Sequence, residues 1–160
     1  LETRNATTEG VKEISIRDLI KASLRMRPDR IVVGEVRGAE AIDMLQALNT
    51  GHDGSLSTGH ANSAKDMLAR LETMVLMGMD LPLAAIRRQI ASGIDLIIHL
   101  GRMRDHTRKV LEIVEITGYE AGEIVTAPIF RFEESESSEK NKVAGRLKKC
   151  GELLHTDKLL

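Results

Sequence analysis

The chain has 160 residues and a formal net charge of −1, so it suits one ordinary domain and carries no charge excess that would indicate a nucleic-acid or anionic-membrane partner. Aromatic residues make up 2% of the sequence, too few for stacking nucleic-acid bases, and a single cysteine excludes an intramolecular disulfide. No apolar run reaches the roughly 18 residues of a membrane span. The polar start "LETRNATTEG" is not typical of a signal peptide, and because it lacks Met we expect the chain to be a piece of a longer protein.

The first 93 residues alternate between predicted helices and strands. In chain order, the predicted elements are a helix over 16–26, a strand over 30–34, a helix over 39–49, a strand over 54–58, a helix over 63–76 and a helix over 82–92. Capping-box patterns at Ser15 and Ser63 mark two of the helix starts, and Pro28 ends the first helix. The run "RIVVG" predicts a strand that is buried on both faces. This alternation is typical of a parallel sheet covered by helices.

The rest of the chain is predicted to be mostly strand. Residues 95–132 form three apolar runs separated by the turn-like stretches "RDHT" and "YEAGE", which favours an antiparallel meander. The next segment is charged and rich in serine, so we expect a mobile loop there. The predicted division is a parallel α/β core over 1–93, a β-rich extension of the same domain over 94–132, the loop over 133–142, and a C-terminal strand and short helix over 143–160.

Polar side chains follow the predicted parallel strands at the points where the strands end. Glu35 follows the first of these strands, and His60 follows the second. Glu2 follows Leu1, which we interpret as the last residue of a further strand. Ligands of open parallel sheets bind at the carboxyl ends of the strands, so we expect these three side chains to line one rim.

The residue types at this rim allow more than one interpretation. Glu35 suits Mg²⁺ binding through water, or the orientation of an attacking water in phosphate chemistry, but it could equally form an ion pair with Arg37. His60 could donate a hydrogen bond to a phosphate oxygen, or it could cap the next helix. A small metal-dependent hydrolase that uses His52, Asp53 and His60 is a third alternative, but the spacing matches no standard zinc pattern.

The sequence holds no phosphate-binding loop of the form G-x-x-x-x-G-K-[ST], the Walker A motif. Such a loop supplies backbone N–H groups and a lysine to the phosphates of a nucleotide. From the residues alone, the chain therefore contains half of a nucleotide site.

Two longer motifs resemble a known family. The stretch "RPDRIVVGEVRG" is similar to the Walker B region of the secretion ATPase superfamily that powers type II and type IV secretion and type IV pili, and "TGHDGSLSTGHANS" is similar to its His box. The chain most resembles the tight-adherence (Flp) pilus assembly ATPase branch, from about Leu1 to Phe132. The resemblance implies a partial RecA-like P-loop NTPase domain with a mainly parallel sheet, followed by a small antiparallel β meander, that works as a hexamer with ATP between subunits.

The resemblance also implies roles for individual residues. Glu35 would be the Walker B glutamate, acting on Mg²⁺ through water and on the attacking water. His60 would contact the γ-phosphate, with His52 as the second histidine of the His box. Glu2 would position or deprotonate water. The full set of implied catalytic and nucleotide-binding residues is Glu2, Gly34, Glu35, Arg37, His52 and His60.

Two functions from different classes follow. In the first, the chain is the C-terminal part of a motor ATPase, cytoplasmic and peripheral at the inner face of the cell membrane. It hydrolyses ATP to ADP and phosphate with Mg²⁺, acts on an inner-membrane platform protein and binds no nucleic acid. We expect the Walker A loop upstream of Leu1, so that the 160 residues alone are inactive. In the second, the chain is a non-catalytic interaction or assembly module with an incomplete ATPase site.

Overall fold

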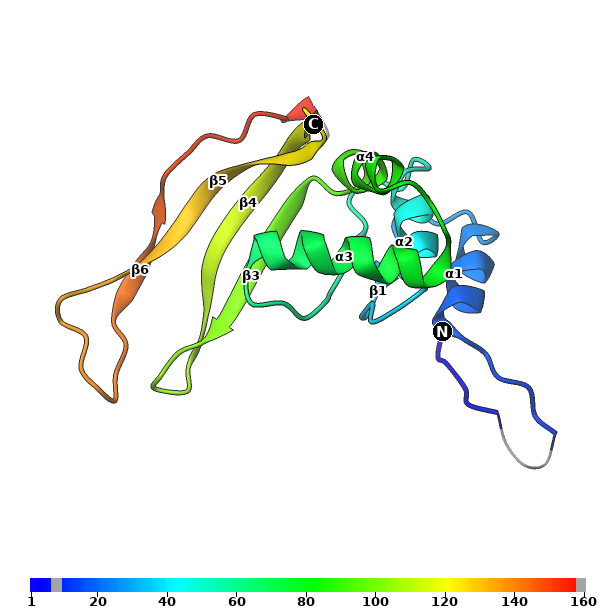
Figure 1. Cartoon of the computed structure of the whole chain (residues 1–160). Coiled ribbons are helices and arrows are strands. Elements are labelled where there is room, and N and C mark those ends of the chain that lie inside the picture. Colours follow the sequence, from blue (N-terminus) through cyan, green and yellow to red (C-terminus); the bar gives the residue numbers. More distant parts are fainter. Residues whose placement is uncertain (7–9, 158–160) are drawn as a thin grey trace.

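A computed structural model of the chain describes residues 1–6 and 10–157. In chain order its elements are α1 (Ile16–Leu24), β1 (Val32–Val33), α2 (Ala41–Leu48), β2 (Leu56–Ser57), α3 (Ala64–Gly78), α4 (Leu83–Gly93), β3 (Leu96–Arg102), β4 (Arg108–Glu120), β5 (Glu123–Glu134) and β6 (Gly145–Lys149). Figure 1 shows the helices and the short strands on one side and the long, twisted sheet of β3 to β6 on the other. The predicted α/β class is confirmed. None of the helices in the described ranges is long and apolar enough to cross a membrane.

Local sequence sets the starts of two helices. At α1 the Ser15 hydroxyl accepts a hydrogen bond from the backbone N–H of Asp18 at 3.2 Å, and the Asp18 carboxylate accepts one from the N–H of Ser15 at 2.9 Å. This is the predicted capping box. At α3 the Ser63 hydroxyl accepts from the N–H of Asp66 at 3.0 Å, but no return bond forms among the described residues. At α3, therefore, the side-chain cap of Ser63 forms but the complete capping box does not.

The parallel sheet is small. β1 and β2 pair in parallel, with Val32 opposite Leu56 and Val33 opposite Ser57. The prediction that the first strand is buried on both faces is wrong, because Val33 is buried but Val32 is 71% exposed and Leu56 65%. The physical reason is that the helical core packs on one face of these two strands, and none of the described elements covers the other.

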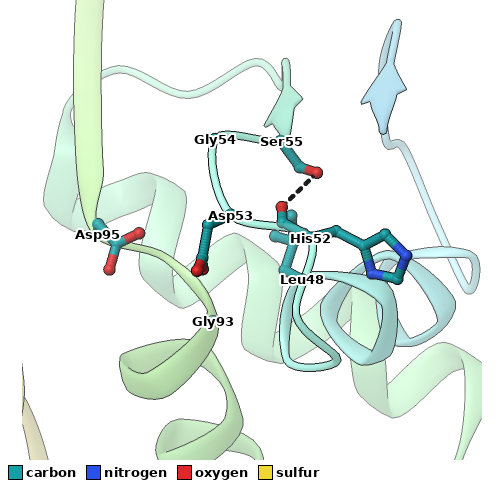
Figure 2. Close-up of a pocket in the computed structure, with 7 residues that line it drawn as sticks. All are labelled: Leu48, His52, Asp53, Gly54, Ser55, Gly93 and Asp95. Carbon is teal, nitrogen blue, oxygen red and sulfur yellow. Dashed lines mark hydrogen bonds between the residues drawn. The ribbon is translucent and has the colours of Figure 1, made fainter. Parts of the chain in front are cut away.

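A tight turn carries the chain from the end of α2 to the amino end of β2 (Figure 2). Gly51 and Gly54 have φ values of 82° and 77°, which glycine adopts without steric cost. The Ser55 hydroxyl donates a hydrogen bond to the His52 carbonyl at 2.7 Å and accepts one from the N–H of Ile31 at 2.8 Å. The turn is thus tied to the residue that precedes β1, and His52 lies at the amino ends of the two strands.

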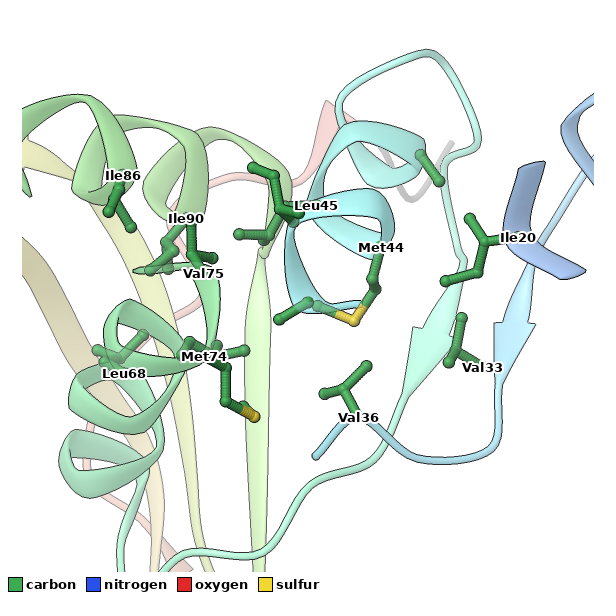
Figure 3. Packing of buried hydrophobic residues seen from close by; sticks show 14 of the residues in the cluster. Ile20, Val33, Val36, Met44, Leu45, Leu68, Met74, Val75, Ile86 and Ile90 are labelled. Atoms are coloured by element: carbon green, nitrogen blue, oxygen red, sulfur yellow. The ribbon is translucent and has the colours of Figure 1, made fainter. Parts of the chain in front are cut away.

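Helix α2 is the centre of the apolar core (Figure 3). Six of its eight residues are buried: Ala41, Ile42, Asp43, Met44, Leu45 and Ala47. The side chains around it come from α1, α3 and α4, with Ile20, Met74 and Ile86 as examples. The carboxylate of Asp43 lies 2.5 Å from the Arg17 guanidinium of α1. Apolar packing and the ion pair between Arg17 and the buried Asp43 carboxylate therefore fix α1 against α2.

Strands β3 to β6 form an antiparallel sheet in chain order, as the meander pattern predicts. The β4–β5 hairpin turns at Ala121 and Gly122, whose φ values of 49° and 89° belong to the two-residue turn that favours hairpins. β3 is an edge strand and exposes alternate aliphatic side chains, namely Leu96, Ile98 and Leu100. Ile97 points the other way and packs against the helical core. Ile116 of β4 and Ile124 of β5 pack against the same core, so β3, β4 and β5 together join the two parts of the fold.

The C-terminal part departs from the prediction at two points. β5 runs to Glu134, so the first two residues of the expected loop lie in the sheet. Residues 150–156 contain no helix, so the expected short helix is not found there, and residues 158–160 lie outside the described chain. A carboxylate on β4 explains why the segment after β6 is extended and not helical. Glu115 is 1% exposed and accepts hydrogen bonds from the N–H groups of Leu154 and His155 at 2.9 and 2.8 Å, which draws this segment across the strand.

Candidate functional site

Glu35 and His60 meet just beyond the carboxyl ends of β1 and β2. Nε2 of His60 lies 2.7 Å from Oε1 of Glu35. The Arg37 guanidinium holds the other carboxylate oxygen, Oε2, with Nη2 at 2.6 Å and Nε at 2.7 Å. The chain therefore brings together a carboxylate, an imidazole and a guanidinium at the rim where the sequence places the first two. The ion pair between Glu35 and Arg37, one of the two interpretations of Glu35, is formed as well.

One oxygen of this carboxylate lies beneath the His60 ring and has no aligned hydrogen bond within the described part of the chain. Oε1 of Glu35 is buried, and no donor among the described residues is aligned for a hydrogen bond to it. Nε2 of the His60 ring lies 2.7 Å from this oxygen and covers it. A carboxylate oxygen of this kind fits Mg²⁺ or a water that Mg²⁺ holds. No cluster of three or more His, Cys, Asp or Glu ligands occurs in the described ranges, so Mg²⁺ would bind here with water or ligand oxygens completing its shell.

The surroundings keep Glu35 ionised. The hydrogen bond from Arg37 is the main cause that lowers the pKa of Glu35 below its usual 4.5, and the positive charges of Arg37 and His60 lower it further against the opposing effect of partial burial. The same hydrogen bond raises the pKa of Arg37. A carboxylate with a lowered pKa is a weak proton acceptor. It suits holding a cation or orienting a water better than removing a proton.

Thr58 links the two strand ends, a role that the sequence analysis did not assign. Its hydroxyl donates a short hydrogen bond to the Gly34 carbonyl, and its carbonyl accepts one from the N–H of Val36 at 3.0 Å. These bonds bridge the chain on both sides of Glu35 to the residue two before His60. A hydroxyl at a strand end was the signal in the sequence, but its partner lies 24 positions away and only the fold shows it.

Glu40 supports the rim from the other side. Its carboxylate accepts hydrogen bonds from the backbone N–H groups of Arg37 at 2.7 Å and Gly38 at 3.1 Å. Burial raises the pKa of Glu40, but these backbone hydrogen bonds outweigh it and the pKa is lowered. A negative side chain next to the start of α2 also suits the helix dipole. The backbone of Arg37 is thus fixed independently of its side chain.

His52 lies away from this rim. Its Nδ1 is 3.1 Å from the carbonyl of Ala47, near the carboxyl end of α2, because the turn that carries it leads into the amino end of β2. Figure 2 shows its ring pointing away from the small pocket beside Asp53. The expectation that His52 joins His60 at one site is therefore not met within this chain. The combination of His52, Asp53 and His60 is not assembled as a metal site in the part that the structure describes.

Glu2 lies in the extended segment that precedes α1. The expected strand at the start of the chain is absent from residues 1–3, and only an isolated antiparallel bridge between Arg4 and Ile14 forms. Figure 1 shows this segment extending away from the sheets. Within the described ranges, Glu2 is exposed and makes no hydrogen bond or ion pair with Glu35 or His60. The structure does not bring Glu2 to the rim.

Comparison with known proteins places the chain in a family. The family described as Type II/IV secretion system protein matches residues 2–158. A putative conjugal transfer protein of Mycobacterium tuberculosis is 47% identical over 113 residues, which are 71% of this chain and 32% of that protein. The conjugal transfer protein TrbB of Rhizobium radiobacter is 37% identical over 72% of this chain and 35% of its own length. The type IV secretion system protein PtlH of Bordetella pertussis is 39% identical over 66% of this chain and 33% of its own length. The chain spans about a third of the length of these relatives.

A solved structure shares the fold. The VirB11 ATPase of the Brucella suis type IV secretion system, crystallised with sulphate, superposes with a TM-score of 0.59 at 35% identity, over 62% of this chain and 31% of that one. This likeness confirms the RecA-like α/β fold that the motifs imply. With the family match over residues 2–158, it shows that the chain belongs to the type II/IV secretion system protein family.

Proposed function

We propose that the chain is the C-terminal part of a hexameric motor ATPase that hydrolyses ATP to ADP and phosphate. The observation that carries the proposal is the contact of 2.7 Å between Glu35 and His60 at the carboxyl ends of two parallel strands. An ionised carboxylate at this position binds a cation or orients water, and an exposed imidazole reaches a phosphate oxygen. Hydrolysis of a nucleotide phosphate uses both groups.

In this proposal ATP and Mg²⁺ are the cofactors, and the chain supplies part of their site. Glu35 holds Mg²⁺ through water and orients the attacking water. His60, whose side chain is 80% exposed, donates a hydrogen bond to the γ-phosphate. Arg37 lowers the pKa of Glu35 and fixes the position of its carboxylate. Gly34 leaves room for the ligand, since a Cβ built there would meet nothing within 4 Å.

Two predicted residues have a smaller part in the proposal. His52 is left out of the site, because its ring contacts the end of α2 at the opposite ends of the strands. The role of Glu2 in positioning water stays a prediction, since this exposed residue lies outside the rim within the described chain.

The cellular role is proposed from the relatives. One is named as a type IV secretion system protein, and the solved neighbour is an ATPase of such a system. We therefore propose that the motor drives type II- or type IV-like secretion or the assembly of a tight-adherence pilus. It would work at the cytoplasmic face of the cell membrane, as a hexamer that acts on an inner-membrane platform protein.

The test is the substitution Glu35→Gln in the complete gene product. We expect ATP turnover to fall at least about 100-fold, because the amide neither holds Mg²⁺ as a carboxylate does nor orients water as well. Binding of ATP, measured by fluorescence of a labelled analogue, should stay close to wild type. Glu13→Gln is the matched control, since Glu13 is exposed and lies outside the site. Turnover that survives in Glu35→Gln would disprove the role of Glu35.

The alternative is a non-catalytic interaction or assembly module. It would apply to a complete gene product that lacks a G-x-x-x-x-G-K-[ST] motif. A complete gene product that neither binds nor hydrolyses ATP, yet forms a stable oligomer, would support this alternative.

A further inference from the structure

Glu112 of β4 reaches the start of α3. Its Oε1 accepts a hydrogen bond of 2.9 Å from the backbone N–H of Ala64, although the two residues are 48 positions apart. Ala64 is the first residue of α3 and only 4% exposed. The first N–H groups of a helix have no partner within the helix, and the helix dipole favours a negative charge there. The meander therefore supplies part of the cap of this helix.

The start of α3 is directly continuous with the segment that carries His60. At one end of this segment Thr58 is hydrogen-bonded to Gly34, directly after β1. At its other end Glu112 is hydrogen-bonded to Ala64, the first residue of α3. Between them, the helix packs closely on the backbone, since a Cβ added at Gly59 would lie 2.6 Å from Cε of Met67. Residues 58–64 are thus held at both ends and along the middle.

The carboxylate of Glu112 has no closer competitor. In the sheet register it stands opposite His99 on β3 and Arg131 on β5. Nδ1 of His99 is 3.8 Å from the same oxygen, and Arg131 forms no ion pair with it in the part of the chain that the structure describes. Among the contacts of this carboxylate, the bond to Ala64 is therefore the one short enough to be a hydrogen bond.

We propose that Glu112 is a positioning residue for His60. By holding the first turn of α3 it keeps residues 58–64 in place, and so keeps the imidazole of His60 against Glu35. Glu112 acts only through α3 and touches no reacting group. The inference rests on the proposed function, in which His60 contacts a phosphate, but the geometry that it concerns can be tested without ATP.

The first test uses NMR on the chain itself. Glu112→Ala should speed hydrogen exchange of the Ala64 amide at least about tenfold, the loss typical of a hydrogen bond to a charged group, and should shift the ring signals of His60. Glu112→Gln keeps the shape and an acceptor oxygen, so it should give smaller changes of the same kind. Exchange of the Ile90 amide in the buried α4 should stay unchanged. Glu120→Ala is the matched control, because Glu120 is exposed on the same strand.

Two outcomes would overturn the proposal. If Ala64 exchanges no faster in Glu112→Ala, the hydrogen bond does not hold the helix start. If Ala64 exchanges faster while the His60 signals stay unchanged, Glu112 caps α3 and does no more. Should the alanine variant fail to fold, the isosteric Glu112→Gln carries both measurements.

A second test uses ATP turnover of the complete gene product. Both Glu112 variants should lower kcat severalfold and leave the KM for ATP near the wild-type value, because a displaced His60 affects the reacting phosphate more than it affects nucleotide binding. An unchanged kcat would overturn the proposal. A wild-type product without ATP hydrolysis would instead count against the proposed function, while the NMR result would still decide the role of Glu112.

Discussion

The hydroxyl of Thr58 donates a hydrogen bond to the carbonyl of Gly34, and this bond joins the strand end that carries Glu35 to the one that leads to His60. Parallel pairing of β1 and β2 stops at Val33 and Ser57. Beyond that point the side chain of Thr58 replaces the next backbone bond of the sheet. Together with the hydrogen bond from the Val36 N–H to the Thr58 carbonyl, this hydroxyl sets the separation of Glu35 and His60.

Replacing Thr58 by Val tests this dependence. Valine keeps the shape and removes the hydroxyl, so the Gly34 carbonyl loses its donor and the hydrogen bond from the Val36 N–H to the Thr58 carbonyl is left to hold the strand ends. We expect ATP turnover of the complete gene product to fall at least about tenfold, since displacement of about 1 Å at a site has effects of this order or more. Thr58→Ser retains the hydroxyl and should behave nearly as wild type. Equal turnover in both variants would show that strand pairing alone sets the geometry.

Arg37→Ala should raise the pKa of Glu35 toward 4.5, because the hydrogen bond from Arg37 is the main cause that lowers it. In the wild type the lowered pKa keeps the carboxylate charged below pH 4.5, and the charge is lost only as the pH falls through the lowered value. A ¹³C NMR titration of the Glu35 carboxyl would measure the change. Arg25→Ala is the control, since this exposed arginine makes no contact with Glu35 among the described residues. An unshifted titration in Arg37→Ala would contradict the assignment.

Arg17→Ala should destabilise the fold by about 2 kcal/mol, because the buried carboxylate of Asp43 loses the closer of its two ion-pair partners, at 2.5 Å. The loss of folding free energy should be smaller than for a fully buried ion pair, since the Arg17 side chain is 37% exposed. Lys21→Ala should cost much less, because Lys21 lies 3.7 Å from Asp43 and is 62% exposed. Urea unfolding followed by circular dichroism measures both. Equal losses would mean that Arg17 does not hold α1 through Asp43.

Glu115→Ala should free the segment after β6. Burial raises the pKa of Glu115, but the backbone N–H groups of Leu154 and His155 outweigh it, so the pKa is lowered below 4.5. The docking of this segment is therefore complete above pH 4.5 and is lost as the pH falls through the lowered value. Limited proteolysis after residue 149 should be about tenfold faster in Glu115→Ala at neutral pH, the scale of a lost hydrogen bond to a charged group. Glu120→Ala, on the exposed end of β4, should leave cleavage unchanged.

Features that depend on neighbouring residues could be predicted from the sequence. The capping box of Ser15 and Asp18 forms as predicted, because all its atoms lie within one turn of chain. The hairpin turn at Ala121 and Gly122 follows from the same kind of local preference. Predicting that Glu35 and His60 lie close together also requires the rule that the carboxyl ends of parallel strands lie at the same edge of the sheet.

Features that depend on distant contacts could not be predicted. Exposure of Val32 depends on whether another layer covers β1, and an apolar run does not reveal that. His52 belongs to the same motif as His60, but the strand between them carries the two rings to opposite ends of the sheet. The burial of Glu115 could not be predicted either, because its hydrogen-bond partners lie about 40 positions away, in a segment whose sequence predicts a helix.

The burial of α2 has a consequence for the order in which the chain folds during synthesis. This helix hides six of its eight residues, but α3 and α4, which cover much of it, follow it in the chain. While the ribosome is still making residues 49–93, α2 lacks the cover of α3 and α4, and the aliphatic side chains that they bury stay in water. Protein segments in that condition attract chaperones and aggregate when they are slow to be covered. Rare codons placed between α2 and α4 should therefore lower the yield of folded protein more than the same codons placed after α4.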